Sequence, residues 1–446
     1  MPVGPAAVGL AEPLFEGRSP GRTVAGVTLR WPRTLLAWAV IVSSVAAVVM
    51  MTEAAKLRNT AWNDTYRYVT AIEKDLGKSD ARAQAIALDF YCDTLGRTTG
   101  NALTRPAIEA KCIADAKATG GLEPNKPRFN LIFDSRPGYP ALAAPFVGLF
   151  GLNRGLAMLS VLLTLAAGWG VLLLIRLAGG GPGAALAGMI ALFALPTWYW
   201  LQQFLTEAPT LVCTIAILIG AVLMLRGRTR LGLAVSTAAF ALGFTVRYST
   251  FSLQAGCMAL TVGLLAWRDR EWRNRRAGLL IGYSAGVFAV LSILPAAFGW
   301  PGFKDSLEDT FTDHYTKPVP PGLYHRWLSL NGDFWTSAFK GYVHDPLVPV
   351  LVLLGAALLW RYRRDLGAIV GAAALTGLGS AAAHPLTSQL DRLYMQVYLL
   401  AVCGLPIVLD LLRRPTVLVV ATDDAPAEHA VEHSAQELTI GATGRS

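Results

Sequence analysis

The sequence predicts an all-α polytopic membrane protein with about 10–11 transmembrane helices, whose extracytoplasmic loops carry short amphipathic helices. Of the 446 residues, 53% are hydrophobic and only 15% are charged, and the mean hydropathy is +0.44. Such a chain is too apolar for a soluble protein, which must cover its core with polar surface. Apolar windows of about 20 residues, the length of one membrane span, also recur along nearly the whole chain.

These windows place ten helices, with boundaries uncertain by several residues. They lie near residues 34–51, 155–177, 183–201, 207–225, 230–248, 251–267, 278–299, 347–361, 366–384 and 393–412. A further apolar stretch, from Tyr139 to Gly151, contains prolines and is too short to cross a bilayer. We therefore interpret it as a re-entrant or interfacial half-helix.

Arginine placement tests this count independently, because short loops rich in Lys and Arg stay in the cytoplasm. Basic residues precede the first predicted helix and follow every even-numbered one: Arg30, Arg33, Arg176, Arg226, Arg228, Arg230, residues 268–276, Arg361, Arg363, Arg364, Arg413 and Arg414. The pattern predicts a plasma-membrane protein whose N- and C-termini both lie in the cytoplasm. The extracytoplasmic segments are then 52–140, the turn before Glu207, the turn at Arg247, 300–346 and the turn from His384 to Arg392.

This topology divides the chain into three parts. Residues 1–33 form a cytoplasmic N-terminal tail, residues 34–412 a transmembrane domain, and residues 413–446 a polar tail with the composition of a disordered segment. The domain includes the mixed-charge loop 52–140 and the aromatic-rich loop 300–346. The net charge of +9 does not predict a nucleic-acid partner, because the arginines occur in short clusters between apolar segments.

The five cysteines fall into two groups. Cys213, Cys257 and Cys403 lie in apolar segments, where a thiol behaves as a small hydrophobic group. Cys92 and Cys112 lie in the polar loop 52–140 with 19 residues between them, a loop that a disulfide can usefully close in an oxidising compartment. The alternative is two unpaired thiols.

Residues 62–68 place Asp64 among aromatic side chains just after the first predicted helix. A partly buried carboxylate there can act as a general base on a sugar or lipid hydroxyl. The structural alternative is that Asn63 or Asp64 caps a helix over residues 65–76.

A proline- and glycine-rich turn before the second predicted helix carries Asp134, Arg136 and Tyr139. Asp134 and Arg136 can pair with each other or bind polar groups of a ligand, and a plain structural turn is the alternative.

Charged residues at the membrane edge are costly and are therefore candidates for function. Glu207 opens the fourth predicted helix, where its charge also suits a helix N-terminus. Arg247 lies between two apolar segments, and either a phosphate ligand or a pair with Glu207 or Asp134 accounts for it.

The last predicted extracytoplasmic turn holds His384, Gln389, Asp391 and Arg392. Arg392 and Arg247 together can neutralise a lipid-linked phosphate, unless Asp391 pairs with Arg392 locally. The aromatic loop adds further cations or donors, each of which can also be an ordinary surface residue: His314, Lys317, His325 and His344.

The order of these short motifs resembles the GT-C superfamily of membrane glycosyltransferases. The resemblance covers most of residues 34–412 and rests on residues 63–68, the Arg-Pro-x-Tyr-Pro element at 136–140, Thr206-Glu207, Val246-Arg247 and the turn at 391–394. The family's Asp-Asp or Asp-Glu pair is absent, because Asn63 precedes Asp64. The Ala-, Gly- and Arg-rich composition also resembles that of actinobacterial proteins that build mannosylated and arabinosylated envelope polymers.

The resemblance implies an inverting transfer of mannose, arabinofuranose or another sugar from a polyprenyl-phosphate donor to an envelope glycan or glycolipid, without a metal or cofactor. Asp64 would be the base. Phosphate binding would fall to Arg247, Arg392, His314 and Lys317. Other substrate contacts would come from Asp134, Arg136, Tyr139, Glu207 and His384.

Two other classes compete with this interpretation. A secondary transporter suits the number of helices, but transporters place charged residues near the midplane and often show two related halves, and no repeat is evident here. A non-catalytic scaffold or flippase-like protein of envelope assembly would need no base at Asp64.

Overall fold

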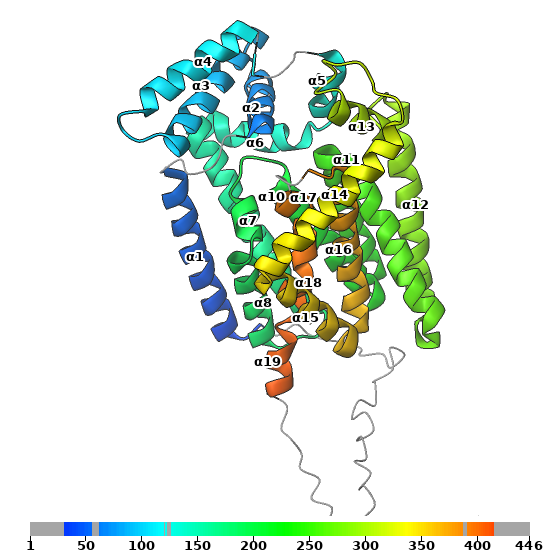
Figure 1. Ribbon diagram of the computed structural model, residues 1–446. Coiled ribbons are helices and arrows are strands. Elements are labelled where there is room, and N and C mark those ends of the chain that lie inside the picture. The colour runs from blue at the N-terminus through cyan, green and yellow to red at the C-terminus, as the bar shows by residue number, and fades with distance from the viewer. Residues whose placement is uncertain (1–30, 56–61, 120, 123–125, 387–389, 414–446) are drawn as a thin grey trace, which may run out of the picture.

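The computed structural model describes residues 31–55, 62–119, 121–122, 126–386 and 390–413 (Figure 1). Regular structure in these ranges is entirely helical. Most of the two tails predicted at 1–33 and 413–446 lies outside the described residues, as does Gln389.

Among the described residues, seven helices are long and apolar enough to cross a membrane, or up to eight if one bent pair forms a single span. They are α1 (Arg33–Ala55), α7 (Leu152–Leu177), α10 (Glu207–Leu225), α11 (Thr229–Arg268), α12 (Arg275–Ala297), α16 (Arg364–Ala383) and the run Met395–Leu412. This confirms an all-α polytopic membrane protein, whereas the predicted count of about 10–11 transmembrane helices is not reached among the described residues. The bounds of α10 match the predicted helix 207–225.

Helix α11 is interrupted at Arg247, whose backbone (φ −162°, ψ 70°) is not helical. A straight helix of its 40 residues would be about 60 Å long, twice the bilayer's hydrocarbon thickness. The helix is not straight, because the parts before and after Arg247 both contact α12. Thr237 in the first part hydrogen-bonds Tyr283, and Ser252 in the second part hydrogen-bonds Ser292. The separate helices predicted at 230–248 and 251–267 therefore correspond to two arms that meet at Arg247.

Prolines break two other predicted helices. The helix predicted over 183–201 is divided into α8 (Pro182–Ala194) and α9 (Thr197–Leu201), because Leu195 adopts the extended backbone that a following proline favours. The last span comprises η3 (Met395–Tyr398), α18 (Leu399–Gly404) and α19 (Ile407–Leu412), with Pro406 at the start of α19. The single helix expected over 393–412 is wrong in this respect.

Short helices gather at one end of the bundle, the upper end in Figure 1. The loop predicted at 52–140 forms α2 (Asn63–Asp75), α3 (Asp80–Thr99), α4 (Arg105–Thr119) and α5 (Pro127–Asp134), and α13 (Phe303–Phe311) lies at the same end. The apolar half-helix expected from Tyr139 to Gly151 is α6 (Gly138–Phe150).

The aromatic segment 300–346 contains a long helix as well as a short one. Helix α14 (Leu323–His344) is followed by α15 (Leu347–Tyr362) after a bend of 97°. The side chains of Trp327 and Asn331 both donate hydrogen bonds to the Ala382 carbonyl at the end of α16. This part of the predicted loop is thus a helix docked on the bundle (Figure 1).

Helix α10 forms the centre of the bundle, since nearly every one of its side chains is buried. By contrast, α1 and α12 expose large apolar residues such as Val45, Val48 and Ile293. A water-soluble protein would bury these faces, so they indicate the surfaces in contact with lipid.

Arginines gather at the opposite, lower end of the bundle. Arg226 donates a hydrogen bond to the Ala178 carbonyl at the end of α7, and Arg276 donates one to the Leu225 carbonyl at the end of α10. Arginine suits these positions, because its charge complements the negative end of a helix dipole.

Cys92 of α3 and Cys112 of α4 are joined by a disulfide, with Cα atoms 5.6 Å apart. Cys213 and Cys403 are buried among apolar side chains. The bridge closes a chain segment that lies outside the spanning helices.

We expect replacement of both bridged cysteines by serine to loosen α3 and α4 without affecting the bundle. Closing a loop of 20 residues contributes about 3 kcal/mol by the chain-entropy relation. Hydrogen exchange should therefore rise by up to roughly 100-fold in α3 and α4. Unchanged exchange in α7 is the control, and unchanged exchange in α3 and α4 would contradict the prediction.

Candidate functional site

A network of charged side chains lies at the upper end of the bundle, where four distant segments meet. Arg392 of α17 (Leu390–Leu393) donates from Nε to Glu207 Oε1 at 2.6 Å and from Nη2 to Asp64 Oδ2. Arg247, at the break in α11, lies with Nη1 3.3 Å from the same Glu207 oxygen. Of the two pairings open to Arg247, the structure shows the one with Glu207.

Glu207 is the central carboxylate of this network. It is the first residue of α10 and its side chain is only 1% exposed, while that of Arg392 is 3% exposed. Its second oxygen, Oε2, is buried without a hydrogen-bond partner among the described residues. The pairing with two guanidinium groups therefore accounts for a charge that burial would otherwise make very costly.

Asp64 belongs to this network because α2 begins just before it. The N-cap residue is Trp62, whose side chain makes no capping hydrogen bond, so the interpretation of Asn63 or Asp64 as the N-cap is wrong. Burial by itself raises the pKa of the Asp64 carboxyl, but Arg392, Arg136 and Arg247 together hold that pKa below its usual value. Asp64 is thus ionised at neutral pH, and its side chain is 26% exposed.

A third guanidinium group, that of Arg136, lies near Asp64. Burial lowers the pKa of Arg136, but the neighbouring Tyr68, Tyr248 and Asp64 raise it above its usual value. Its Nε atom is buried without a hydrogen-bond partner in the described chain. Three arginines and two carboxylates give the network a formal charge of +1.

Gly138 explains how the turn that carries Arg136 reaches Arg247. A Cβ atom at this position would lie 2.4 Å from Thr245 Oγ1 and 2.9 Å from the Val246 nitrogen. Only glycine lets the start of α6 approach the break in α11 this closely. The contact brings Arg136 and Arg247 to the same site.

Two buried tyrosines border the network. Tyr68 and Tyr139 pack edge to face with ring centroids 5.3 Å apart, and the Tyr139 hydroxyl group is buried without a partner among the described residues. An unsatisfied buried hydroxyl is costly, so this group is available to a polar ligand.

His384 lies near the network, just after α16. Its Nε2 atom is 2.9 Å from Ser306 Oγ and its Nδ1 atom is 3.4 Å from Thr310 Oγ1, both on α13. Burial, with Arg136 and Arg247, lowers the pKa of His384 to about 4 against weaker opposing effects of Asp309 and Asp64. The ring is therefore neutral at pH 7.

The remaining predicted residues take no part in the charged network of Asp64, Glu207, Arg247 and Arg392. His314 contacts Asp309 at 3.1 Å and packs on Phe129 with ring centroids 4.4 Å apart. Lys317 is exposed and pairs with Asp313 at 3.1 Å. Asp134 is exposed at the end of α5, and its pairing with Arg136, one of the options that the sequence left open, is not seen among the described residues. The two side chains are separated because α5 ends at Asp134 and the backbone turns before Arg136.

A small cavity of about 250 Å³ lies beside the network. It is lined by Glu207, Thr210, Arg247, Thr250, Ser380, Arg392, Leu393, Met395 and Gln396. Deeper in the bundle, Thr214 hydrogen-bonds both Gln254 and Gln396. Our sequence analysis missed these uncharged polar residues, although Glu207, Thr210 and Thr214 share one face of α10 at helical spacing.

In the part of the chain that the structure describes, no three His, Cys, Asp or Glu side chains are grouped to hold a metal ion. Carboxylates at the site are instead held by guanidinium groups. A scan against protein-family models, a search of curated proteins and a search of solved structures each returned no match to this chain.

We expect Arg392→Gln to destabilise the protein by about 3–5 kcal/mol, because it leaves the buried Glu207 carboxylate without its closest cation. The double variant Glu207→Gln/Arg392→Gln should recover part of that loss. Denaturant unfolding in detergent measures both changes. Lys317→Gln, at an exposed pair, is the control and should change stability by no more than about 0.5 kcal/mol. A similar loss of stability in Lys317→Gln would contradict the conclusion that burial of the Glu207–Arg392 pair causes the effect.

His384 should make the folded state less stable as the pH falls. Its pKa of about 4 lies below the ordinary value of 6.5, so between these values the unfolded chain binds a proton that the folded chain excludes. Stability should fall with decreasing pH by up to about 1.4 kcal/mol per unit. His384→Gln should flatten this dependence between pH 5 and 6.5, whereas His344→Gln should not. Identical profiles for His384→Gln and the parent would refute the prediction.

Proposed function

We propose that the chain is an inverting glycosyltransferase that moves a sugar from a polyprenyl-phosphate donor to a cell-envelope glycan or lipid. The observation that carries the proposal is the convergence of Asp64, Arg136, Arg247 and Arg392 at one end of an apolar helix bundle. A carboxylate and a surplus of guanidinium charge are the two groups that this reaction requires at one membrane surface.

The charge of the network suits the donor's phosphate. A phosphate that joins a sugar to a lipid is a diester with one negative charge, which offsets the formal charge of +1. Guanidinium groups bind phosphate oxygens in bidentate geometry and stabilise the charge that develops on a departing phosphate. They would therefore act in the place of a metal ion.

Asp64 is the proposed base. Its carboxylate takes the proton of the acceptor hydroxyl as that oxygen bonds to the anomeric carbon, and the bond from this carbon to the phosphate oxygen breaks with its electron pair. The lowered pKa keeps Asp64 ionised, and the exposed quarter of its side chain gives an acceptor access. Bound phosphate would compete with Asp64 for Arg392 and so release the carboxylate.

The cavity beside the network is small, so we place only the phosphate against its lining. The lipid would extend along the apolar helices and the sugar would face α2 and α13. The alternation of arginine-rich loops supports an extracytoplasmic site on a multi-pass plasma-membrane protein.

The position of the network argues against a secondary transporter, which places its ion and substrate sites near the bilayer midplane. A scaffold or flippase-like protein requires no ionised carboxylate at Asp64. The scaffold or flippase-like protein is a distinct outcome of the experiment below.

We expect purified protein to convert one member of a panel of polyprenyl-phosphate sugars, and Asp64→Asn to lower kcat by roughly 10²- to 10⁴-fold. Arg136→Gln should raise the donor KM by about 10- to 100-fold, as loss of a charge-assisted contact predicts. Asp80→Asn, at an exposed pair with Lys74, is the matched control. Full turnover by Asp64→Asn would exclude the base role, and donor binding without turnover in the parent would favour the scaffold.

A further inference from the structure

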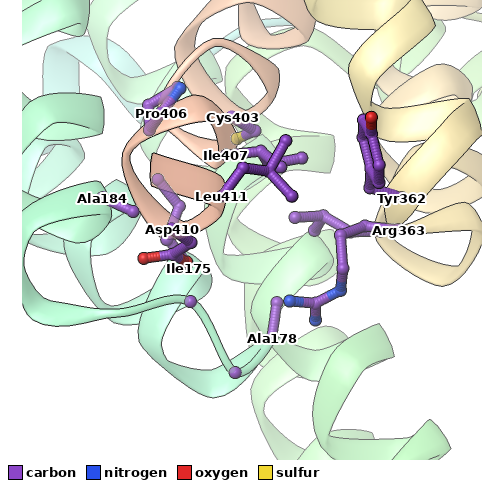
Figure 2. A pocket seen from close by; sticks show the side chains of 13 residues that line it. Ile175, Ala178, Ala184, Tyr362, Arg363, Cys403, Pro406, Ile407, Asp410 and Leu411 are labelled. Carbon is purple, nitrogen blue, oxygen red and sulfur yellow. The ribbon is translucent and has the colours of Figure 1, made fainter. Parts of the chain in front are cut away.

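A second pocket, of about 520 Å³, lies at the lower end of the bundle, away from the charged network. It is formed between the ends of α7 and α15, the starts of α8 and α16, and α18 and α19. Figure 2 shows Arg363 reaching toward Ala178 on one side, with Ile407 and Leu411 beside it.

Arg363 lines one wall of this pocket, and Arg226 lies beside that wall. A methyl group at Gly179 would lie 3.1 Å from Arg226 Nη2 and 3.8 Å from Arg363 Nη2, so two guanidinium groups border the same glycine. Burial and the charge of Arg363 lower the pKa of Arg226, against an opposing effect of Asp365. Two like charges held this close favour an anion between them.

The nearby carboxylates do not cancel this charge. Arg363 Nε is 3.6 Å from Asp365, and Asp410 on the opposite side accepts a 2.8 Å hydrogen bond from the Gly181 nitrogen. Arg176 and Arg413 also border the pocket's glycine-rich loop through Gly180 and Gly183. Of these side chains, Arg363 and Asp410 line the pocket itself. Around the pocket, four arginines against two aspartates leave two positive charges in surplus.

The other wall is apolar and consists of Ile175, Ala184, Leu366, Cys403, Ile407 and Leu411. Because the pocket lies where helices that span the membrane end, it sits at the depth of lipid headgroups. Basic pockets between membrane helices bind anionic headgroups. A ligand with a phosphate and an adjoining hydrocarbon chain matches both walls, whereas a free phosphate matches only one.

We propose that this pocket binds the phosphate of an anionic phospholipid, with Arg226 and Arg363 holding the phosphate and the Ile407–Leu411 wall contacting the start of an acyl chain. The site is separate from the charged network at the upper end, and the proposal does not depend on the reaction assigned there.

Native mass spectrometry of the delipidated full-length protein tests the proposal. Phosphatidylglycerol should bind at least about tenfold more tightly than phosphatidylcholine with the same acyl chains. Both lipids carry the phosphodiester, but only phosphatidylcholine adds a cationic group, which the surrounding arginines repel. Arg363→Gln should remove that preference and Arg363→Lys should restore part of it. Arg361→Gln is the matched control, since Arg361 lies two residues away, is exposed and stacks on Tyr362.

Leu411→Trp provides a second variant that keeps every arginine and fills the apolar side of the pocket, and it should also weaken phosphatidylglycerol binding. Thermal unfolding without lipid verifies that each variant is folded. Equal losses in Arg361→Gln and Arg363→Gln would overturn the proposal in favour of general surface attraction. Equal binding of the two lipids, or full displacement of phosphatidylglycerol by millimolar inorganic phosphate, would also overturn it.

Discussion

The buried pair between Glu207 and Arg392 is the interaction on which the upper half of the structure depends. Both side chains are almost inaccessible, and an unpaired charge at such a position costs several kcal/mol. Glu207 begins the most buried helix, so Arg392 must approach from the far end of the chain and Arg247 from the break in α11. Asp64 then completes the coordination of Arg392. Four segments are thereby held at one point.

The two ends of the bundle use arginine differently. At the upper end, Arg247 and Arg392 are paired with carboxylates from distant segments, and Arg136 supplies the surplus charge. At the lower end, Arg176 and Arg226 donate to carbonyl groups at helix ends and leave the pocket positively charged. The first arrangement fixes a carboxylate beside cations, as group transfer requires. The second provides fixed positive charge at a membrane surface, where anionic lipids are available.

An interrupted helix is what makes the upper site possible. The break at Arg247 presents a guanidinium group at the junction of two helical arms, and Gly138 lets the turn before α6 reach it. A continuous helix through Arg247 would carry its polar side chains past the site, because side-chain positions along a helix are fixed by its period.

Hydropathy in the sequence determined that the chain is a helical membrane protein, and it located nearly every spanning helix, because about 20 apolar residues in succession have few other stable environments. Residue type also singled out Asp64, Glu207, Arg247 and Arg392, since charges beside apolar segments are rare. Only the tertiary structure decided which residues these four pair with. It also showed that Arg136 and not Asp134 belongs to the site, and that Lys317 lies on the surface. Such pairings join residues up to 328 positions apart, and they depend on helix packing that no local pattern specifies.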